Sequence, residues 1–239
     1  MTATEHKNPI PTDKPLRRVR TFMARGAALN TSQKSGMEEY GPRLLQKVSE
    51  VKNFDSKVLF GREAPVTFEI GFGMGFSIIE MAENMPERDF VGIEIHTPGI
   101  AQLVYEAGSR KLNNVRVFDG DALLLLEHHV PDGSLDTVQL FFPDPWQKTK
   151  HYKRRLVQAE NAALIRRKLK VGGVFHMATD WANYAEWMLE IMEAAPGYEN
   201  CAGAGNYSER PATRPLTKFE ERGKKMGHGV WDLLYRRKD

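Results

Sequence analysis

The chain has 239 residues, of which 41% are apolar and 27% charged, and its formal net charge is +3 at pH 7. This length and apolar content suffice for one sizeable core, and the nearly balanced charge excludes a protein that is basic over its whole surface. A single cysteine, Cys201, excludes a disulfide framework and a cysteine-based metal site. The sequence has no run of 18 consecutive apolar residues and no apolar leader, which predicts a soluble cytoplasmic protein.

The N-terminal segment is polar, basic and rich in Pro and Thr. Residues 1–34 hold seven Lys or Arg against Glu5 and Asp13. This composition predicts a flexible basic arm over residues 1–35, followed by a single domain over residues 36–239. Such an arm is either a solubilising tail or a segment that orders against a polyanion, and we favour the second interpretation.

A helix is expected over residues 37–52, and strands alternate with helices from Pro65 onward. The predicted strands are residues 66–71, 90–95, 115–120, 135–142 and 172–180. The predicted helices are residues 76–85, 98–112, 122–129, 153–169 and 181–194. This alternation is typical of βαβ units, which build a parallel sheet with helices on both faces. Because ligands of such sheets bind beyond the carboxyl ends of the strands, a site is expected there.

The first of these strands ends in EIGFGMGF, which contains Glu69, Gly71, Gly73 and Gly75. Glycines at this place allow a tight turn and a close approach of a ligand to the backbone, although a plain strand-to-helix turn would use them too. The third glycine of a nicotinamide-dinucleotide fingerprint would fall on Phe76. The spacing E-x-G-x-G-x-G instead resembles the glycine loop of class I S-adenosylmethionine-dependent methyltransferases.

Acidic residues also end the next two strands. Glu94 lies nineteen residues after Gly75, and an acidic residue about 20 positions after a glycine loop is where a ribose diol is held. Asp121 follows the third strand, where methyltransferases of this fold often contact adenine, and its structural alternative is an N-cap of the helix 122–129. Three acidic residues at three successive strand ends together favour a cofactor site.

The fourth strand runs into QLFFPDPW and then into a basic run, residues 148–155. Pro143 and Pro145 restrict the backbone on both sides of Asp144, and Trp146 offers a flat apolar surface beside it. Cationic side chains bind phosphate and aromatic rings stack on unpaired bases, so the basic run predicts RNA binding. The structural alternative is a rigid loop followed by a solvated helix start. The RNA-binding residues expected here are Lys150, His151, Lys153, Arg154 and Arg155.

Several motifs together resemble the bacterial tRNA (guanine-N7-)-methyltransferase family, over residues 16–237. They are PLRRVR, EIGFGMG, GIEIH, QLFFPDPW with the basic run, GGVFHMATD and RPLTKFEERG. The resemblance implies an α/β, Rossmann-like class I methyltransferase fold with a mostly parallel seven-stranded sheet. It also implies methyl transfer from S-adenosyl-L-methionine to N7 of guanine 46 in the variable loop of tRNA, without a metal. The protein could be a monomer or a homodimer.

The resemblance assigns roles residue by residue. It places Glu69, Glu94, Asp121 and Asp144 around the cofactor, to which the glycine loop adds Gly71 and Gly73, and it makes Asp144 the catalytic residue. It assigns substrate binding to Lys148, Asp180, Thr217, Lys218, Phe219 and Glu220. Whether Asp144 acts mainly in catalysis or in binding is open at this stage.

Some of these residues have structural alternatives. Asp180 either caps the helix after it or contacts the target base, and Thr217-x-x-Glu220 has the pattern of a capping box. His176 is expected to be a satisfied core histidine, and His128 with its neighbour to cap a helix. The rival functions are a methyltransferase for small molecules or proteins, which leaves the basic run unexplained, and a non-catalytic RNA-binding module, which leaves the acidic set unexplained.

Overall fold

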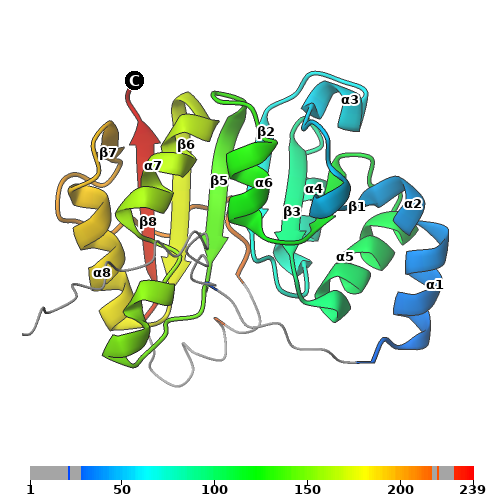
Figure 1. Ribbon diagram of the computed structural model, residues 1–239, viewed down its shortest axis with the longest axis horizontal. Coiled ribbons are helices and arrows are strands. Elements are labelled where there is room, and N and C mark those ends of the chain that lie inside the picture. The colour runs from blue at the N-terminus through cyan, green and yellow to red at the C-terminus, as the bar shows by residue number, and fades with distance from the viewer. Residues whose placement is uncertain (1–20, 22–27, 217–219, 221–228) are drawn as a thin grey trace, which may run out of the picture.

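The computed structural model describes residue 21, residues 28–216, residue 220 and residues 229–239, and Figure 1 shows them as a central sheet with helices on both faces. The strands are β1 (Leu45–Lys47), β2 (Val66–Ile70), β3 (Asp89–Glu94), β4 (Val115–Asp119), β5 (Leu135–Phe141), β6 (Leu169–Thr179), β7 (Tyr198–Asn200) and β8 (Trp231–Arg237). The α-helices are α1 (Thr31–Glu39), α2 (Gly41–Leu44), α3 (Ser56–Phe60), α4 (Phe76–Asn84), α5 (Thr97–Ser109), α6 (Ala122–His128), α7 (Ala159–Lys168) and α8 (Ala182–Glu193). Two 3₁₀ helices are η1 (Val48–Glu50) and η2 (Thr149–Arg154).

The strands follow the order β1-β4-β3-β2-β5-β6-β8-β7. All neighbours from β1 to β6 are parallel, and β8 runs antiparallel to β6 and β7. The chain builds outward from β2 in one direction with β3 and β4 and then in the other with β5 and β6. The junction of β2 and β5 is therefore the point where the strand order reverses, and open α/β sheets bind ligands beside this point.

The two faces of the sheet are covered by different helices. Helices α6, α7 and α8 cover one face, which Figure 1 shows in front of the sheet, and their apolar side chains form one core cluster. Helices α4 and α5 belong to a second cluster, to which α1 adds Met37. Every residue of β2 is buried, as expected for a central parallel strand, and this includes the polar Glu69.

The expected fold class is confirmed, since the sheet is mostly parallel and lies between two helical layers. The described residues form eight strands rather than the seven expected. No helix among the described residues is long and apolar enough to cross a membrane.

The prediction of one helix over residues 37–52 is wrong. A capping box formed by Asn30 and Gln33 starts α1 at Thr31, within the predicted arm, and Gly41 with Pro42 at the start of α2 breaks the helical path. Residues 45–47 then form β1, which pairs with β4 and covers the edge of that strand. Pairing of this edge satisfies backbone groups that a helix here would leave open. Before α1, only Thr21 and residues 28–30 of the arm belong to the described residues.

The helix predicted over residues 153–169 is divided in two. Residues 149–154 form η2 and residues 159–168 form α7. Between them, Leu156 and Val157 are buried against the cluster that contains α7 and α8. Burial of these two side chains turns the chain toward the core, and α7 starts only after this turn.

Candidate active site

A cavity of about 380 Å³ lies beyond the carboxyl ends of β2, β3, β4 and β5. In Figure 1 the arrowheads of β3 and β5 point to this lower edge of the sheet. The cavity brings together five of the residues expected from sequence, and these are Gly71, Gly73, Glu94, Asp121 and Asp144. Thr21 also lines the cavity, so a residue of the N-terminal arm reaches its rim.

The glycine loop after β2 exposes its backbone to this cavity. Gly71 and Gly73 have φ angles of +71° and +60°, and a Cβ atom on either would meet nothing within 4 Å. A side chain at these positions would therefore fill space that the backbone now leaves to a ligand. Gly75 and Gly99 serve packing instead, because a Cβ on Gly75 would lie 2.8 Å from Leu103 and one on Gly99 would lie 1.9 Å from the Gly73 carbonyl oxygen.

Glu94 ties the glycine loop to the turn before α5. Its Oε2 accepts a hydrogen bond of 3.0 Å from the Gly73 N–H, and its Oε1 accepts bonds from the N–H groups of Ile95 (2.7 Å) and His96 (3.1 Å). Three backbone donors hold the carboxylate in one orientation at the cavity wall. A carboxylate offers about four acceptor positions, so one position remains for a hydroxyl group of a ligand.

Glu69 lies deeper, beneath the glycine loop. It lines a second cavity of about 600 Å³ that shares Gly71, Gly73 and Phe142 with the first. Ser77 Oγ donates to its Oε1 at 3.1 Å. The pKa of Glu69 is raised to about 8, mainly by burial. The Ser77 hydrogen bond lowers this pKa, and the charge of Glu94 adds a smaller increase. Ser77 carried no sequence signal apart from its place in the first turn of α4.

Asp121 has the structural role considered for it and also lies at the cavity. It is the N-cap of α6, and its Oδ1 accepts a hydrogen bond of 2.9 Å from the Leu123 N–H. The same residue lines the first cavity. The cap holds the carboxylate at the cavity, so the structural interpretation supports the functional one.

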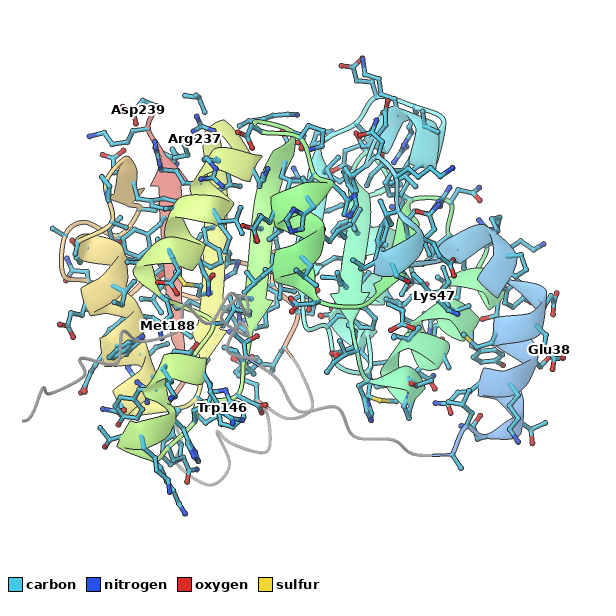
Figure 2. The ribbon with its side chains drawn as sticks, in the orientation of Figure 1. Glu38, Lys47, Trp146, Met188, Arg237 and Asp239 are labelled. Carbon is cyan, nitrogen blue, oxygen red and sulfur yellow. The ribbon has the colours of Figure 1, made fainter. Side chains whose placement is uncertain are left out.

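Residues 142–147, called here the Asp144 loop, are held more tightly than the two prolines alone require. Asp144 is exposed and lines the first cavity. Phe142 and Trp146 on either side have φ angles of +50° and +46°, a conformation that costs on the order of 1–3 kcal/mol for each such residue. The Phe142 N–H donates to the Ala178 carbonyl (2.8 Å), and Trp146 Nε1 donates to the Thr21 carbonyl (3.1 Å). Figure 2 places Trp146 at the same lower edge of the sheet.

The basic run extends from the Asp144 loop into η2. Lys148, Lys150 and Lys153 are exposed there. The Arg154 guanidinium lies 4.9 Å from the centre of the Trp146 ring, and the His151 ring meets the same indole edge-on at 5.9 Å. Desolvation lowers the pKa of His151, and the cations of the basic run, Arg154 first, lower it further. The run therefore presents positive charge and an aromatic surface beside the cavity.

Arg155 does not belong to this exposed surface, and its predicted role in RNA binding is corrected. Its side chain is 0% exposed. Its Nε donates to the Pro145 carbonyl at 3.0 Å and its Nη2 to Asn183 Oδ1 at 2.7 Å. The guanidinium also faces the rings of Tyr152 and Tyr184 at 3.6 Å and 4.8 Å. A cation enclosed in this way is inaccessible to phosphate.

Asp180 and Lys148 line neither cavity. Asp180 is half-buried directly after β6, one strand away from the Asp144 loop. The capping alternative for Asp180 is not found, because the N-cap of α8 is Trp181, whose N–H is bound by Thr179 Oγ1 at 3.2 Å. Contact with a target base therefore remains a prediction for Asp180.

Glu220 faces inward rather than toward a substrate. It is 1% exposed, and its carboxylate receives two hydrogen bonds from Arg214, of 2.6 Å and 3.1 Å. Arg214 also binds both oxygens of Asp232, and Asp232 Oδ1 lies 2.8 Å from His176 Nε2. Direct substrate binding by the Glu220 carboxylate is thus contradicted, and His176 is confirmed as a buried histidine with a partner. Thr217, Lys218 and Phe219 lie outside the described residues.

Among the described residues, no group of three or more His, Cys, Asp or Glu side chains has the arrangement of a metal site. His128 lies in the last turn of α6, as expected for a residue that interacts with the helix dipole.

Comparison with known proteins agrees with this geometry. Residues 63–233 match a family model described as "Putative methyltransferase". A protein of Shewanella amazonensis named tRNA (guanine-N(7)-)-methyltransferase is 54% identical over 223 residues, which cover 93% of each chain. A protein of Pseudomonas putida with the same name is 51% identical over 237 residues, which cover 98% of each chain.

Solved structures share the fold at low sequence identity. The 16S rRNA methyltransferase KamB is 16% identical and superimposes with a TM-score of 0.56 over 79% of this chain and 96% of its own. The [4+2]-cyclase SpnF, also 16% identical, gives a TM-score of 0.51 over 89% of this chain and 98% of its own. Because proteins of such different activity share this architecture, the fold alone does not decide the reaction.

Proposed function

Because the chain belongs to the tRNA (guanine-N(7)-)-methyltransferase family, we propose that it uses S-adenosyl-L-methionine to methylate N7 of guanine 46 in the tRNA variable loop. Methyl transfer to guanine N7 in tRNA is the activity that the family name states. The observation that carries the proposal for this chain is the cavity beyond β2 to β5, in which the glycine loop, Glu94, Asp121 and Asp144 meet beside the exposed basic run.

The residues of the two cavities suit S-adenosyl-L-methionine, which supplies an electrophilic methyl group on a sulfonium centre. Glu94 would accept from a ribose hydroxyl, and Asp121 would accept from the adenine amino group. The open space at Gly71 and Gly73 would let the ligand approach the backbone closely. Glu69, at the second cavity, would be placed for the amino-acid end, whose ammonium group would stabilise its ionised form.

Guanine N7 has an in-plane lone pair and carries no proton, so the reaction needs no general base. The rate depends mainly on how N7 is positioned. Methylation leaves the guanine ring with a positive charge. A fixed carboxylate stabilises this charge as it develops, and Asp144 is the exposed carboxylate at the mouth of the cavity. The same carboxylate can accept from the ring N–H and the amino group of guanine, which adenine does not present together.

The basic run brings the RNA to this carboxylate. Lys148, Lys150 and Lys153 are exposed side chains that neutralise backbone phosphates. Arg154, over the Trp146 ring, adds a planar cation close to the Asp144 loop. Asp180, at the end of the neighbouring strand, is the second carboxylate proposed to contact the target base.

The proposal is tested with unmodified tRNA and labelled S-adenosyl-L-methionine, followed by mapping of the labelled base. We expect label on N7 of guanine 46. Asp144→Asn is expected to lower kcat on the order of 100-fold because it removes the charge that stabilises the transition state. Its dissociation constant for the cofactor should stay close to that of the wild type.

Asp121→Asn is the matched control, because it also exchanges an acidic side chain at the cavity for its amide. This variant should weaken cofactor binding more than it lowers kcat at saturating cofactor. Near-normal turnover of Asp144→Asn would refute the role of Asp144. If the wild-type protein binds the cofactor but labels only small molecules or proteins, tRNA is not its substrate. If it binds no cofactor, the rival function of a non-catalytic RNA-binding module is favoured.

A further inference from the structure

Arg155 is a buried cation that directly contacts the Asp144 loop. We propose that Arg155 is a positioning residue, which fixes the Asp144 loop against η2 and α8 so that the Asp144 carboxylate keeps its place at the cavity. This inference rests on the proposed function, because it assigns a cause to the geometry of the same site. It replaces the RNA-binding role that the sequence suggested for this arginine.

The first support is the contact between Arg155 and the loop backbone. Arg155 Nε donates to the carbonyl oxygen of Pro145, the residue directly after Asp144, at 3.0 Å. Two of the six residues in the loop, Pro143 and Pro145, have no N–H to offer as donors. Phe142 N–H and Trp146 Nε1 donate outward from the loop, and the Arg155 guanidinium donates inward to one of its carbonyl oxygens.

The second support is the enclosure of the guanidinium on its other sides. It lies 3.6 Å from the ring centre of Tyr152 in η2, and 4.8 Å and 5.3 Å from those of Tyr184 and Trp187 in α8. Asn183, also in α8, accepts from its Nη2 at 2.7 Å and from the Tyr152 hydroxyl at 2.8 Å. One planar group thus joins the Asp144 loop to two other elements.

The third support is that burying the Arg155 guanidinium costs free energy that an apolar side chain in this space would not cost. Its Nη1 has no hydrogen-bond partner among the described residues, and burial lowers the pKa of the guanidinium. A buried cation without a complete set of partners is weak as a source of stability, and an apolar side chain would be better. What an apolar side chain lacks is the fixed donor to Pro145, so geometry accounts for the choice of arginine.

The neighbouring Arg154 provides a contrast within the same 3₁₀ turn. Arg154 is half-buried with its guanidinium over the outer indole of Trp146, and it belongs to the surface proposed to bind tRNA. Adjacent arginines therefore have different tasks. Arg154 should affect how tightly tRNA binds, and Arg155 should affect how well bound tRNA reacts.

The test compares Arg155→Lys with Arg154→Lys in the full-length protein, with unmodified tRNA. Lysine keeps the charge but loses the planar fork that reaches Pro145 and Asn183 together. We expect Arg155→Lys to lower kcat roughly 10- to 100-fold, as for a catalytic group displaced by about 1 Å. The KM for tRNA and the dissociation constant of the cofactor should change little. Arg154→Lys should raise the KM for tRNA and keep kcat.

A second pair of variants distinguishes loss of loop positioning from a general destabilisation of the fold by Arg155→Lys. Asn183 is an exposed residue of α8, so Asn183→Ala removes the acceptor of Arg155 without opening the core. Its kcat is expected to fall, whereas Asn183→Asp, which keeps an acceptor, should retain it. Hydrogen exchange of a peptide covering residues 142–147 should be faster in Arg155→Lys and in Asn183→Ala than in Arg154→Lys.

The outcomes separate this inference from the proposed function. If the wild-type protein methylates guanine N7 in tRNA while Arg155→Lys and Asn183→Ala keep normal kcat and normal exchange in the loop, the positioning role is wrong. If the wild type does not methylate tRNA, the proposed function is wrong, and the exchange measurements still decide whether Arg155 holds the loop.

Discussion

At the scale of single residues, two acidic side chains at the cavity, Glu94 and Asp121, are held by structural contacts in the absence of a ligand. Glu94 binds three backbone N–H groups, and Asp121 caps α6. These contacts restrict the carboxylates to one orientation, so less freedom remains to be lost when a ligand binds. For these two residues, the contact that has a structural role also orients the carboxylate for the proposed binding role.

Glu69 leads to a prediction about pH. Its pKa in the folded protein, about 8, lies above the ordinary value of 4.5, mainly because the carboxyl group is buried. The folded state therefore retains a proton that the unfolded state releases between these two values. Stability from this group is complete below pH 4.5 and is lost as the pH rises through about 8.

The measurement is the free energy of unfolding of the cofactor-free protein between pH 5 and 9, compared with Glu69→Gln. Glutamine keeps the shape of the protonated acid but cannot ionise. The wild type should lose stability relative to Glu69→Gln as the pH rises, and the difference should level off above about pH 8. A difference that stays constant with pH would mean that Glu69 titrates normally.

At the scale of elements, the glycine loop depends on how closely α5 approaches it. A Cβ atom on Gly99, at the start of α5, would lie 1.9 Å from the carbonyl oxygen of Gly73. Backbone cannot yield as a flexible side chain can, so an added methyl group must push the loop and the helix apart. This contact connects the packing of a helix with the shape of the cofactor cavity.

Gly99→Ala is therefore expected to destabilise the protein by about 1–3 kcal/mol through overpacking and to weaken cofactor binding as well. Gly41→Ala is the control, since Gly41 lies in α2 and a Cβ there would meet nothing within 4 Å. That variant should be neutral or stabilising by up to about 1 kcal/mol. Thermal unfolding and a cofactor titration measure both effects, and equal behaviour of the two variants would contradict the argument.

At the scale of the whole molecule, the net charge is small but the positive charges are clustered. The net charge is only +3, yet the basic run lies beside the cavity. Thr21, within the basic part of the arm, accepts a hydrogen bond from Trp146 and lines the same cavity. The contact at Thr21 supports the prediction that the N-terminal arm and the basic run form one surface for tRNA.

Deletion of residues 1–25 is expected to weaken tRNA binding and to make it less dependent on salt. Each phosphate contact releases counterions from the RNA, so the loss of contacts reduces the number of counterions released on binding. Deletion of residues 1–13 is the matched control, because this piece holds Lys7 against Glu5 and Asp13, whereas residues 14–25 hold only basic charges. The slope of log affinity against log salt should fall only for the longer deletion. An unchanged slope would make the arm a solubilising tail.

The sequence by itself determined the parallel sheet and most of the proposed cofactor site. Glu69, Glu94 and Asp121 end successive strands, and the carboxyl ends of parallel strands meet at one edge whatever the details of packing. Alternation of strands and helices is a local signal, and so is the glycine spacing. The five expected residues that line the first cavity could therefore be predicted from the sequence.

The tertiary structure alone decided which charged side chains face outward. Arg154 and Arg155 are neighbours in one basic run, and only contact with Tyr184 and Trp187, some thirty residues later, buries the second. Glu220 likewise turns inward because Arg214 is anchored by Asp232 of β8. A charge run has the same pattern in sequence whether its members are solvated or enclosed, because burial depends on partners brought together only by folding.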